Sequence, residues 1–273
     1  MMTEKSPLTV DALTPAQITE KALSLSVVKT QMPWHTQIPL AILAGFFIGL
    51  GALFCSLSTA DPTLSFAVKK IVSGVVFSLG LFLVVVAGAE LYTGNTMVAG
   101  GAMDGRISWG ATVGNWVRVW CLNFVGALAL VTFVFFAHVA DMGPMASGMM
   151  GIAVGKLTPD WTTLMFKGIL CNLLVCLGVW LSFAARSVAD RLAAVVLPVA
   201  AFVALGFEHC VANMYFLPMA YVLKLAGYAP AGVNLDVITL ANIAKNLSAA
   251  TVGNTIAGLL LVGLYRWAFA KRQ

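Results

Sequence analysis

Charge is scarce in this sequence: Asp, Glu, Lys and Arg make up 10% of its 273 residues, whereas hydrophobic residues make up 60%. A mean hydropathy of +0.93 is too high for a soluble domain of this length. The five cysteines form no Cys-x-x-Cys pair and no cluster with histidine, which argues against a metal site or a disulfide framework. A Gly-x-Ser-x-Gly nucleophile elbow is missing as well. The composition favours an all-α membrane protein, with no cofactor, no metal and no nucleic-acid partner expected.

Six apolar stretches follow one another along the chain, and we predict that each crosses a lipid bilayer: 37–57, 71–103, 119–139, 168–185, 192–223 and 247–265. The second and fifth hold 33 and 32 residues. A straight helix of that length spans about 50 Å, whereas the hydrocarbon core is about 30 Å thick. We therefore predict that both are broken into a half-helix, a short loop and a second half-helix.

The two predicted breaks share a polar motif. Gly88-Ala-Glu-Leu-Tyr-Thr-Gly-Asn-Thr-Met97 in the first resembles Gly206-Phe-Glu-His-Cys-Val-Ala-Asn-Met214 in the second. Glu90 and Glu208 lie 118 residues apart, as do Asn95 and Asn213. Three spans separate the two breaks, so the units containing them run in opposite directions. This pattern predicts an inverted repeat whose breaks meet near the middle of the membrane, on a substrate path.

The chain divides into a segment before the first span, a pore domain and a short tail. The pore domain is predicted at 37–266, with repeats at about 37–139 and 161–266, and the tail at 267–273. Residues 1–36 carry charges and no apolar core, which is unlike a signal peptide. Within them, Thr14-Pro15-Ala16-Gln17 is typical of a helix start. The apolar side chains that recur after it predict an amphipathic helix, either a surface anchor or a cover on a pore mouth: Ile18, Ala22, Leu25 and Val28.

An even number of spans places both ends on one side of the membrane. Nine basic residues fall on that side and five on the other, which predicts that both ends are cytoplasmic. The nine are Lys5, Lys21, Lys29, Arg106, Arg186, Arg191, Arg266, Lys271 and Arg272, and the five are Lys69, Lys70, Lys156, Lys224 and Lys245. The pair Lys69-Lys70 runs against the trend.

His209 is the one histidine inside a predicted span, and it lies in a duplicated polar break. Neutral imidazole would donate one hydrogen bond to a small anion, and protonated imidazole would supply a proton to a weak acid. Thr93 offers a hydroxyl in the other break. For Glu90 and Glu208 we favour a structural role, capping backbone amides or orienting a neighbour, over proton transfer. Half-helices beginning near Asn95 and Asn213 would aim their positive ends at the midpoint.

Two lysines lie near the entrance of the fourth span. Lys156 falls in a Gly- and Met-rich loop predicted from Ala140 to Asp160, and Lys167 lies at the start of the span. Each would raise the local anion concentration at a pore mouth, although Lys167 could equally extend to the membrane interface. Apolar residues near the breaks are either packing or tight constrictions: Phe77, Leu81, Leu91, Tyr92, Phe202 and Phe207.

Five motifs together resemble the formate/nitrite transporter family over roughly residues 10–270: Phe77-Ser-Leu-Gly80, Ala89-Glu-Leu-Tyr-Thr-Gly-Asn95, Lys167-Gly-Ile-Leu-Cys-Asn172, the segment Gly206–Met214 and Val252-Gly-Asn254. The resemblance implies an aquaporin-like fold of six spans in a homopentamer with one pore per subunit. It also implies a central site flanked by Thr93 and His209 and an outer vestibule at Lys156. The further path residues it implies are Leu81, Leu91, Tyr92, Phe202, Lys167 and Asn172.

The substrate is less specifically marked. The segment around Gly206 and Arg186-Ser-Val-Ala-Asp190 are similar to formate channels, whereas Gly94-Asn-Thr-Met97 and Phe166-Lys-Gly168 are similar to the nitrite branch. Hydrosulfide channels share the Gly-Asn frame. We favour passive or proton-coupled passage of formate across a bacterial inner membrane. An intramembrane hydrolase using Cys210 and a channel for neutral solutes are the alternatives, and the former is disfavoured because adjacent residues seldom aim at one substrate.

Overall fold

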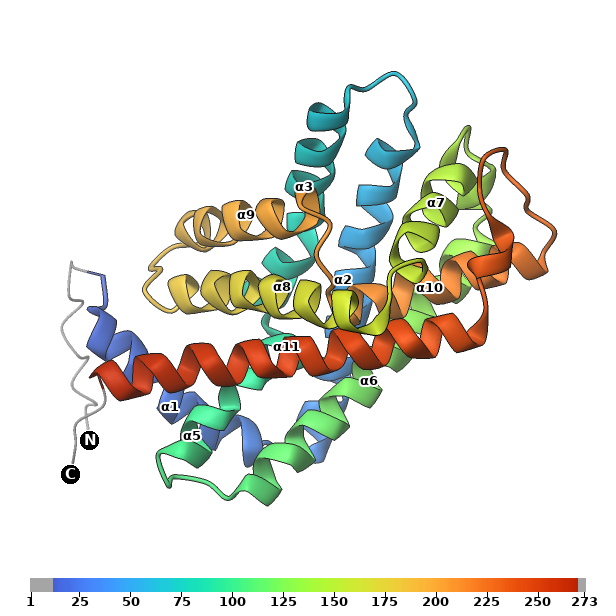
Figure 1. Cartoon of the computed structure of the whole chain (residues 1–273). Coiled ribbons are helices and arrows are strands. Elements are labelled where there is room, and N and C mark those ends of the chain that lie inside the picture. The colour runs from blue at the N-terminus through green and yellow to red at the C-terminus, as the bar shows by residue number, and fades with distance from the viewer. Residues whose placement is uncertain (1–11, 270–273) are drawn as a thin grey trace.

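The computed structural model describes residues 12–269, and every regular element within that range is helical. Figure 1 shows the helices side by side with α11 running beneath α8. The elements in chain order are α1 (Pro15–Thr30), α2 (Trp34–Ala60), α3 (Phe66–Leu83), η1 (Val84–Gly88), α4 (Tyr92–Asn95), η2 (Thr96–Val98), α5 (Ala99–Met103), α6 (Trp109–Phe136), η3 (Val139–Asp141), α7 (Met145–Leu157), α8 (Trp161–Ser182), α9 (Val188–Ala204), α10 (Cys210–Leu225), η4 (Leu235–Val237) and α11 (Leu240–Phe269).

Five helical stretches among the described residues are long and apolar enough to cross a membrane: Trp34–Ala60, Phe66–Gly88, Trp109–Phe136, Trp161–Ser182 and Leu240–Phe269. An all-α membrane protein is therefore confirmed. The count of six crossings stays a prediction, because the expected fifth span is divided between α9 and α10. The first, third and last helices extend well beyond the apolar stretches that predicted them.

The expected loop from Ala140 to Asp160 is wrong, because it contains the thirteen-residue helix α7. Its glycines gave a loop-like composition, but Gly148 serves close packing instead. A Cβ at Gly148 would lie 2.7 Å from the backbone oxygen of Ser56 on α2. Lys156 thus lies in the last turn of a helix and has a fixed position.

The helical path is interrupted at both copies of the polar motif. After α3 the chain makes one π-helical stretch to Gly88, is extended at Ala89, and resumes as a helix at Tyr92. After α9 it resumes at Cys210. Gly88 and Gly206 adopt φ values of +81° and +69°, where glycine is favoured over residues with a side chain. The second segments begin three residues earlier than expected, at Tyr92 and Cys210 and not at Asn95 and Asn213.

The two halves of the chain are interlocked through these second segments. Helix α10 packs on α2 and α6, whereas α4, η2 and α5 pack on α11, and α4 also contacts α8. Helices α3 and α9 lie against each other between the halves. Because each half completes the packing of the other, the two breaks are brought to the centre of the molecule.

Helix α1 is confirmed with its capping box, in which Thr14 and Gln17 each bond the backbone of the other. Its buried face differs from the expected one. Leu23 is fully buried whereas Val28 is 57% exposed, since the helix packs on η2, α5 and α11. The remaining expectations for residues 1–11 and 270–273, including Lys5, Lys271 and Arg272, lie outside the described residues.

Candidate functional site

The first break is held by a buried carboxylate. Glu90 accepts hydrogen bonds from Lys29 Nζ at 2.5 Å and from Asn95 Nδ2 at 2.8 Å. Asn95 Nδ2 also donates to Asn115 Oδ1 at 3.1 Å, and Asn115 Nδ2 donates to the carbonyl of Lys29 at 3.1 Å. The side chain of Glu90 is 6% exposed and that of Lys29 is 25% exposed. The carboxylate therefore pairs with a cation and orients an amide, and it does not cap the backbone.

The second break repeats this arrangement with different residues. Glu208 accepts from Lys156 Nζ at 3.2 Å and from Asn213 Nδ2 at 2.6 Å. Asn213 Nδ2 donates to Asn246 Oδ1 at 2.7 Å, and Asn246 Nδ2 donates to the carbonyl of Lys156 at 2.8 Å. Lys156 thus corresponds to Lys29, and α7 corresponds to α1. The helix treated as a separate N-terminal segment belongs to the same polar frame as its counterpart.

One asparagine in each half fixes the loop of its break. Asn123 Oδ1 accepts from the amide of Tyr92 at 2.8 Å, and its Nδ2 donates to the carbonyls of Ala41 and Glu90 at 2.7 and 2.9 Å. Asn254, 131 residues later, does the same for the amide of Cys210 at 2.9 Å and the carbonyls of Gly168 and Glu208 at 2.8 and 2.9 Å. Each side chain satisfies three backbone groups that a continuous helix would pair internally.

Thr93 and His209 meet at the centre, 3.0 Å apart between Oγ1 and Nε2. The other ring nitrogen, Nδ1 of His209, accepts from the amide of Ala212 at 3.0 Å and caps α10. A nitrogen that accepts from an N–H carries no proton, so in neutral imidazole the proton lies on Nε2. Nε2 therefore donates to Thr93, whose own hydroxyl proton is left to donate elsewhere. Both side chains are buried.

Apolar side chains surround this pair. The ring of Phe202 stacks on His209 with centroids 5.9 Å apart, and Phe77 packs edge-on against Phe202 at 5.7 Å. Leu81 and Leu91 are each 2% exposed. An unpaired ion among such groups loses its hydration without compensation, so the only polar partners at this depth are decisive.

Two cavities approach the centre from opposite directions. The Lys29 vestibule has a volume of about 420 Å³ and is lined by residues that include Lys21, Lys29, Glu90, Leu91 and Arg191. The Lys156 vestibule has a volume of about 300 Å³ and is lined by residues that include Lys69, Lys70, Lys156, Lys167, Glu208 and His209. In each, lysine and arginine outnumber the single glutamate. Neither lining includes Thr93 or Leu81, so the two vestibules end on either side of the central pair.

The comparisons with known proteins address this arrangement directly. The family model described as formate/nitrite transporter matches residues 16–268. The chain belongs to the formate/nitrite transporter family. It is 38% identical to the formate channel FocA of Escherichia coli strain K12, over 96% of each chain. It is 34% identical to the nitrite transporter NirC of Salmonella typhimurium strain LT2, over 82% of this chain and 80% of that one.

Solved structures give the same assignment. A pentameric formate channel with formate bound matches with a TM-score of 0.76 and 36% identity, covering 86% of this chain and 96% of that one. An ion channel of the formate/nitrite transporter family matches with a TM-score of 0.82 and 29% identity, covering 93% and 99% of the two chains. The chain is thus a multi-pass membrane protein with the helical architecture of this transporter family.

The residues singled out from the sequence are distributed unevenly over the site. Thr93, His209, Leu91 and Phe202 lie at the centre or on the adjoining walls, and Lys167 lines the Lys156 vestibule. Tyr92 is tied down by its hydroxyl, which lies 2.7 Å from Thr255 Oγ1 on α11.

Asn172 also serves the scaffold. Its Nδ2 donates to the carbonyls of Thr93 and Asn254 at 3.2 and 2.6 Å. Its Oδ1 has no hydrogen-bond partner among residues 12–269. Asn172 therefore fixes the backbone behind Thr93, and its side chain is not part of either vestibule lining.

Several residues that build this transporter site were missed from the sequence: Lys29, Asn115, Asn123, Asn246 and Asn254. A signal was present in the asparagines. Asn115 and Asn246 lie 131 residues apart, and so do Asn123 and Asn254. A polar residue repeated at one spacing within apolar spans indicates a duplicated structural role.

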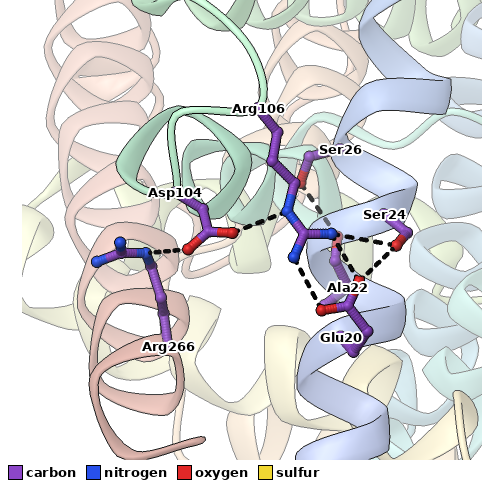
Figure 2. Close-up of polar contacts among 7 residues, drawn as sticks. All are labelled: Glu20, Ala22, Ser24, Ser26, Asp104, Arg106 and Arg266. Atoms are coloured by element: carbon purple, nitrogen blue, oxygen red, sulfur yellow. Dashed lines mark hydrogen bonds and ion pairs between the residues drawn. The ribbon is translucent and has the colours of Figure 1, made fainter. Parts of the chain in front are cut away.

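Helix α1 is fastened at the end of the Lys29 vestibule by an ion network (Figure 2). Arg106 donates to both oxygens of Glu20 at 2.6 and 2.8 Å and to Asp104 at 2.8 Å, and Arg266 donates to Asp104 at 2.8 Å. The hydrogen bonds with Glu20 hold the pKa of Arg106 above its usual value. Since α1 lines the cavity, the network fixes one wall of the vestibule.

Electrostatics at the same mouth favour anions. Partial burial, followed by the nearby Arg191 guanidinium, lowers the pKa of Lys21 from its ordinary value. The expected alternative of a surface anchor therefore gives way to a helix that closes part of the cavity mouth.

Proposed function

We propose that this chain forms a channel for small monovalent weak-acid anions and that formate is its main substrate, with nitrite and then hydrosulfide as alternatives. The observation that carries the proposal is the central Thr93–His209 hydrogen bond, placed between two basic vestibules and enclosed by apolar side chains. The similarity to channels named for formate, at 38% and 36% identity, supports formate over nitrite.

Anions are gathered at both ends of the path. The Lys156 vestibule carries four lysines against Glu208, which is itself paired with Lys156. The Lys29 vestibule carries Lys21, Lys29 and Arg191 against Glu90, again a paired carboxylate. A cavity with a net positive lining and low-dielectric walls raises the local anion concentration. The pairing of both glutamates prevents them from repelling the substrate.

The substrate then exchanges water for hydrogen bonds at the centre. Nε2–H of His209 and the hydroxyl of Thr93 turn from each other to the anion, which costs one hydrogen bond and provides two. A monovalent ion with one or two compact oxygens fits this number of donors, whereas a hydrated ion is excluded by Phe202, Leu81 and Leu91. Loss of hydration is thereby partly offset over a short distance.

The cap on α10 bears on proton coupling. Neutral His209 that gave up its Nε2 proton would become an imidazolate, so a proton can be delivered only from imidazolium. Imidazolium needs a proton on Nδ1, where the amide of Ala212 already donates. Protonation would therefore break the helix cap. We infer that His209 acts mainly as a neutral hydrogen-bond donor and that transport is passive.

The membrane arrangement completes the proposal. Six crossings are formed by α2, α3 with α4–α5, α6, α8, α9 with α10, and α11, in the inner membrane of a bacterial-type cell. Both chain ends are cytoplasmic, so the Lys29 vestibule faces inward and the Lys156 vestibule outward. Lys69 and Lys70, which oppose the charge rule, line the outer vestibule. The polar frames support repeats of α1–α6 and α7–α11 in place of 37–139 and 161–266. The assembly is a homopentamer, as described for the similar formate channel.

The test is flux into proteoliposomes with formate, nitrite, hydrosulfide and acetate at several pH values. We expect formate to pass fastest and without chemical change. His209→Asn keeps a cap for Ala212 and removes the titratable ring. It should lower formate flux about tenfold or more while leaving the shape of the pH dependence unchanged. A pH dependence that disappears in this variant would favour proton coupling. Flux of every anion equal to that of protein-free vesicles, with water or ammonia passing freely, would overturn the proposal.

A further inference from the structure

A group of three hydroxyls lies against the Lys156 vestibule and is not used by the central site. Ser73 Oγ on α3 lies 2.8 Å from Ser58 Oγ and 3.2 Å from Thr59 Oγ1, both on α2. Ser73 and Thr59 line the vestibule, and Lys70 and Lys156 line it as well. Ser73 is 4% exposed, so its hydroxyl is held in one place by packing.

The three protons of this cluster have more than one arrangement. Ser58 and Thr59 each have the backbone carbonyl of Cys55 within reach, at 3.0 and 3.1 Å, and each can instead donate to Ser73. When either of them donates to Ser73, the hydroxyl proton of Ser73 is not needed within the cluster. That proton is then available to a guest in the vestibule. A hydroxyl that accepts from a neighbour is also a better donor, because hydrogen bonds in a chain polarise one another.

Positive charge is close to these hydroxyls and is not neutralised. Lys69, Lys70 and Lys167 form no salt bridge with a carboxylate within residues 12–269. Lys70 Nζ lies 5.8 Å from the centroid of the Phe66 ring, a contact that leaves its donors largely unused. The charges of Lys70 and Lys156 both reach Cys55, which is one helical turn from Thr59.

The corresponding positions of the other half are different. By the spacing that relates the two halves, Cys55, Thr59 and Ser73 correspond to Ser182, Arg186 and Arg191. Of these, Ser182 and Arg191 line the Lys29 vestibule. The one cavity therefore presents guanidinium where the other presents hydroxyls, so the cluster is a local feature and not a requirement of the repeated scaffold.

We propose that Ser73 and Thr59, together with Lys70 and Lys156, form a binding subsite for a small oxyanion in the Lys156 vestibule, ahead of the Phe202 constriction. This inference rests on the proposed function, because it concerns the same path. A carboxylate or nitrite has two oxygens, so one accepts from a hydroxyl while the other faces an ammonium group. Hydrosulfide has one large sulfur atom, which is a weak acceptor, and gains little from the hydroxyls. The subsite thus favours oxyanions over hydrosulfide.

The experiment compares Ser73→Ala with Ser78→Ala in proteoliposomes. Ser78 is also buried in α3 and bonded to backbone carbonyls, but it does not line the vestibule. We expect Ser73→Ala to raise the formate concentration for half-maximal flux about three- to tenfold and to leave that for hydrosulfide unchanged. Ser78→Ala should change neither value. An equal rise for both anions in Ser73→Ala, or no rise for formate, would overturn the subsite.

A second pair of variants protects the test against misfolding. Thr59→Val keeps the shape of the side chain and removes the hydroxyl, and Thr59→Ser keeps the hydroxyl. We expect the first to raise the half-saturating formate concentration and the second to restore it. Recovery that fails in Thr59→Ser while Thr59→Val still transports would contradict the inference. Because the wild-type protein must first move formate, absence of its flux overturns the proposed function, whereas normal wild-type flux with unaffected variants overturns the subsite alone.

Discussion

The two halves of the molecule use one polar frame and differ at the three residues that follow each glutamate. In the frame, Lys29, Glu90, Asn95, Asn115 and Asn123 correspond to Lys156, Glu208, Asn213, Asn246 and Asn254, with the same atoms bonded in each. After the glutamate, one half has Leu-Tyr-Thr and the other has His-Cys-Val. The repeated residues hold the breaks open, and the residues that differ decide what the breaks bind.

The difference places a single donor in each half. Thr93 comes from the first break and His209 from the second, and they meet at the centre because the second segments of the halves are exchanged. A symmetric pair of histidines would carry two titratable groups in an apolar space, and a symmetric pair of threonines would lack a ring donor. Departure from the repeat is therefore where function is concentrated.

The largest effect is expected from removing the asparagine that fixes a loop. Asn254→Leu leaves the amide of Cys210 and the carbonyls of Gly168 and Glu208 without partners in a fully buried place. Each unpaired buried group costs about 1–3 kcal/mol, so the free energy of unfolding should fall by about 3 kcal/mol or more. Asn123→Leu should cost the same. Denaturant unfolding of the detergent-solubilised protein measures both.

The matched control is Asn234→Leu, the same change on the surface, where the side chain accepts only from Asp236. It should cost about 1 kcal/mol or less. If Asn123→Leu were tolerated and Asn254→Leu were not, the two halves would share a geometry but not its energetic role.

The next effect separates the two ion pairs. Lys156→Met leaves Glu208, 2% exposed, without its cation, and Lys29→Met does the same to Glu90, 6% exposed. Leaving one partner of a buried pair unpaired is strongly destabilising, and water access to the lysines reduces the cost here to about 2–3 kcal/mol. The loss should be somewhat larger for Lys156→Met, because the Lys156 side chain is 15% exposed and that of Lys29 is 25% exposed.

Double variants identify the cause. Lys156→Met combined with Glu208→Gln removes both charges and should recover a large part of the lost stability, since no buried charge is left alone. Lys29→Met with Glu90→Gln should behave alike. Additive losses in either double variant would mean that the lysine acts through packing and not through the pair.

The sequence was sufficient to predict both breaks and the meeting of Thr93 with His209. Length against bilayer thickness required an interruption in 71–103 and 192–223, and the duplicated Gly-x-Glu motif located it. These features are local, so each could be recognised within about ten residues. The capping box of α1 was predictable for the same reason.

The rest depended on contacts between distant residues. Lys29 lies 61 residues from Glu90, and Asn254 lies 46 residues from Glu208. In the sequence Lys29 is an ordinary surface charge, and only the packing of α1 on η2 and α5 brings it to the carboxylate. Helix α7 was missed because its glycines and methionines resemble a loop, although the glycines serve contact with α2.

The smallest effect concerns how each half holds its first helix. Helix α7 is held by amide and ammonium donors to its last carbonyls, from Asn246 and Lys245 at 2.8 and 2.9 Å. Helix α1 has the Asn115 bond but relies in addition on the exposed network of Arg106. An exposed ion pair contributes at most about 1 kcal/mol, so Arg106→Gln should speed backbone hydrogen exchange in α1 by up to about fivefold. Exchange in α7 of the same protein is the internal control and should stay constant. Since salt screens exposed charges, high salt should produce the same acceleration in the wild-type protein and none in the variant. If exchange rose equally in both helices, the network would stabilise the whole fold, and the contrast between the two mouths would not lie in how their helices are held.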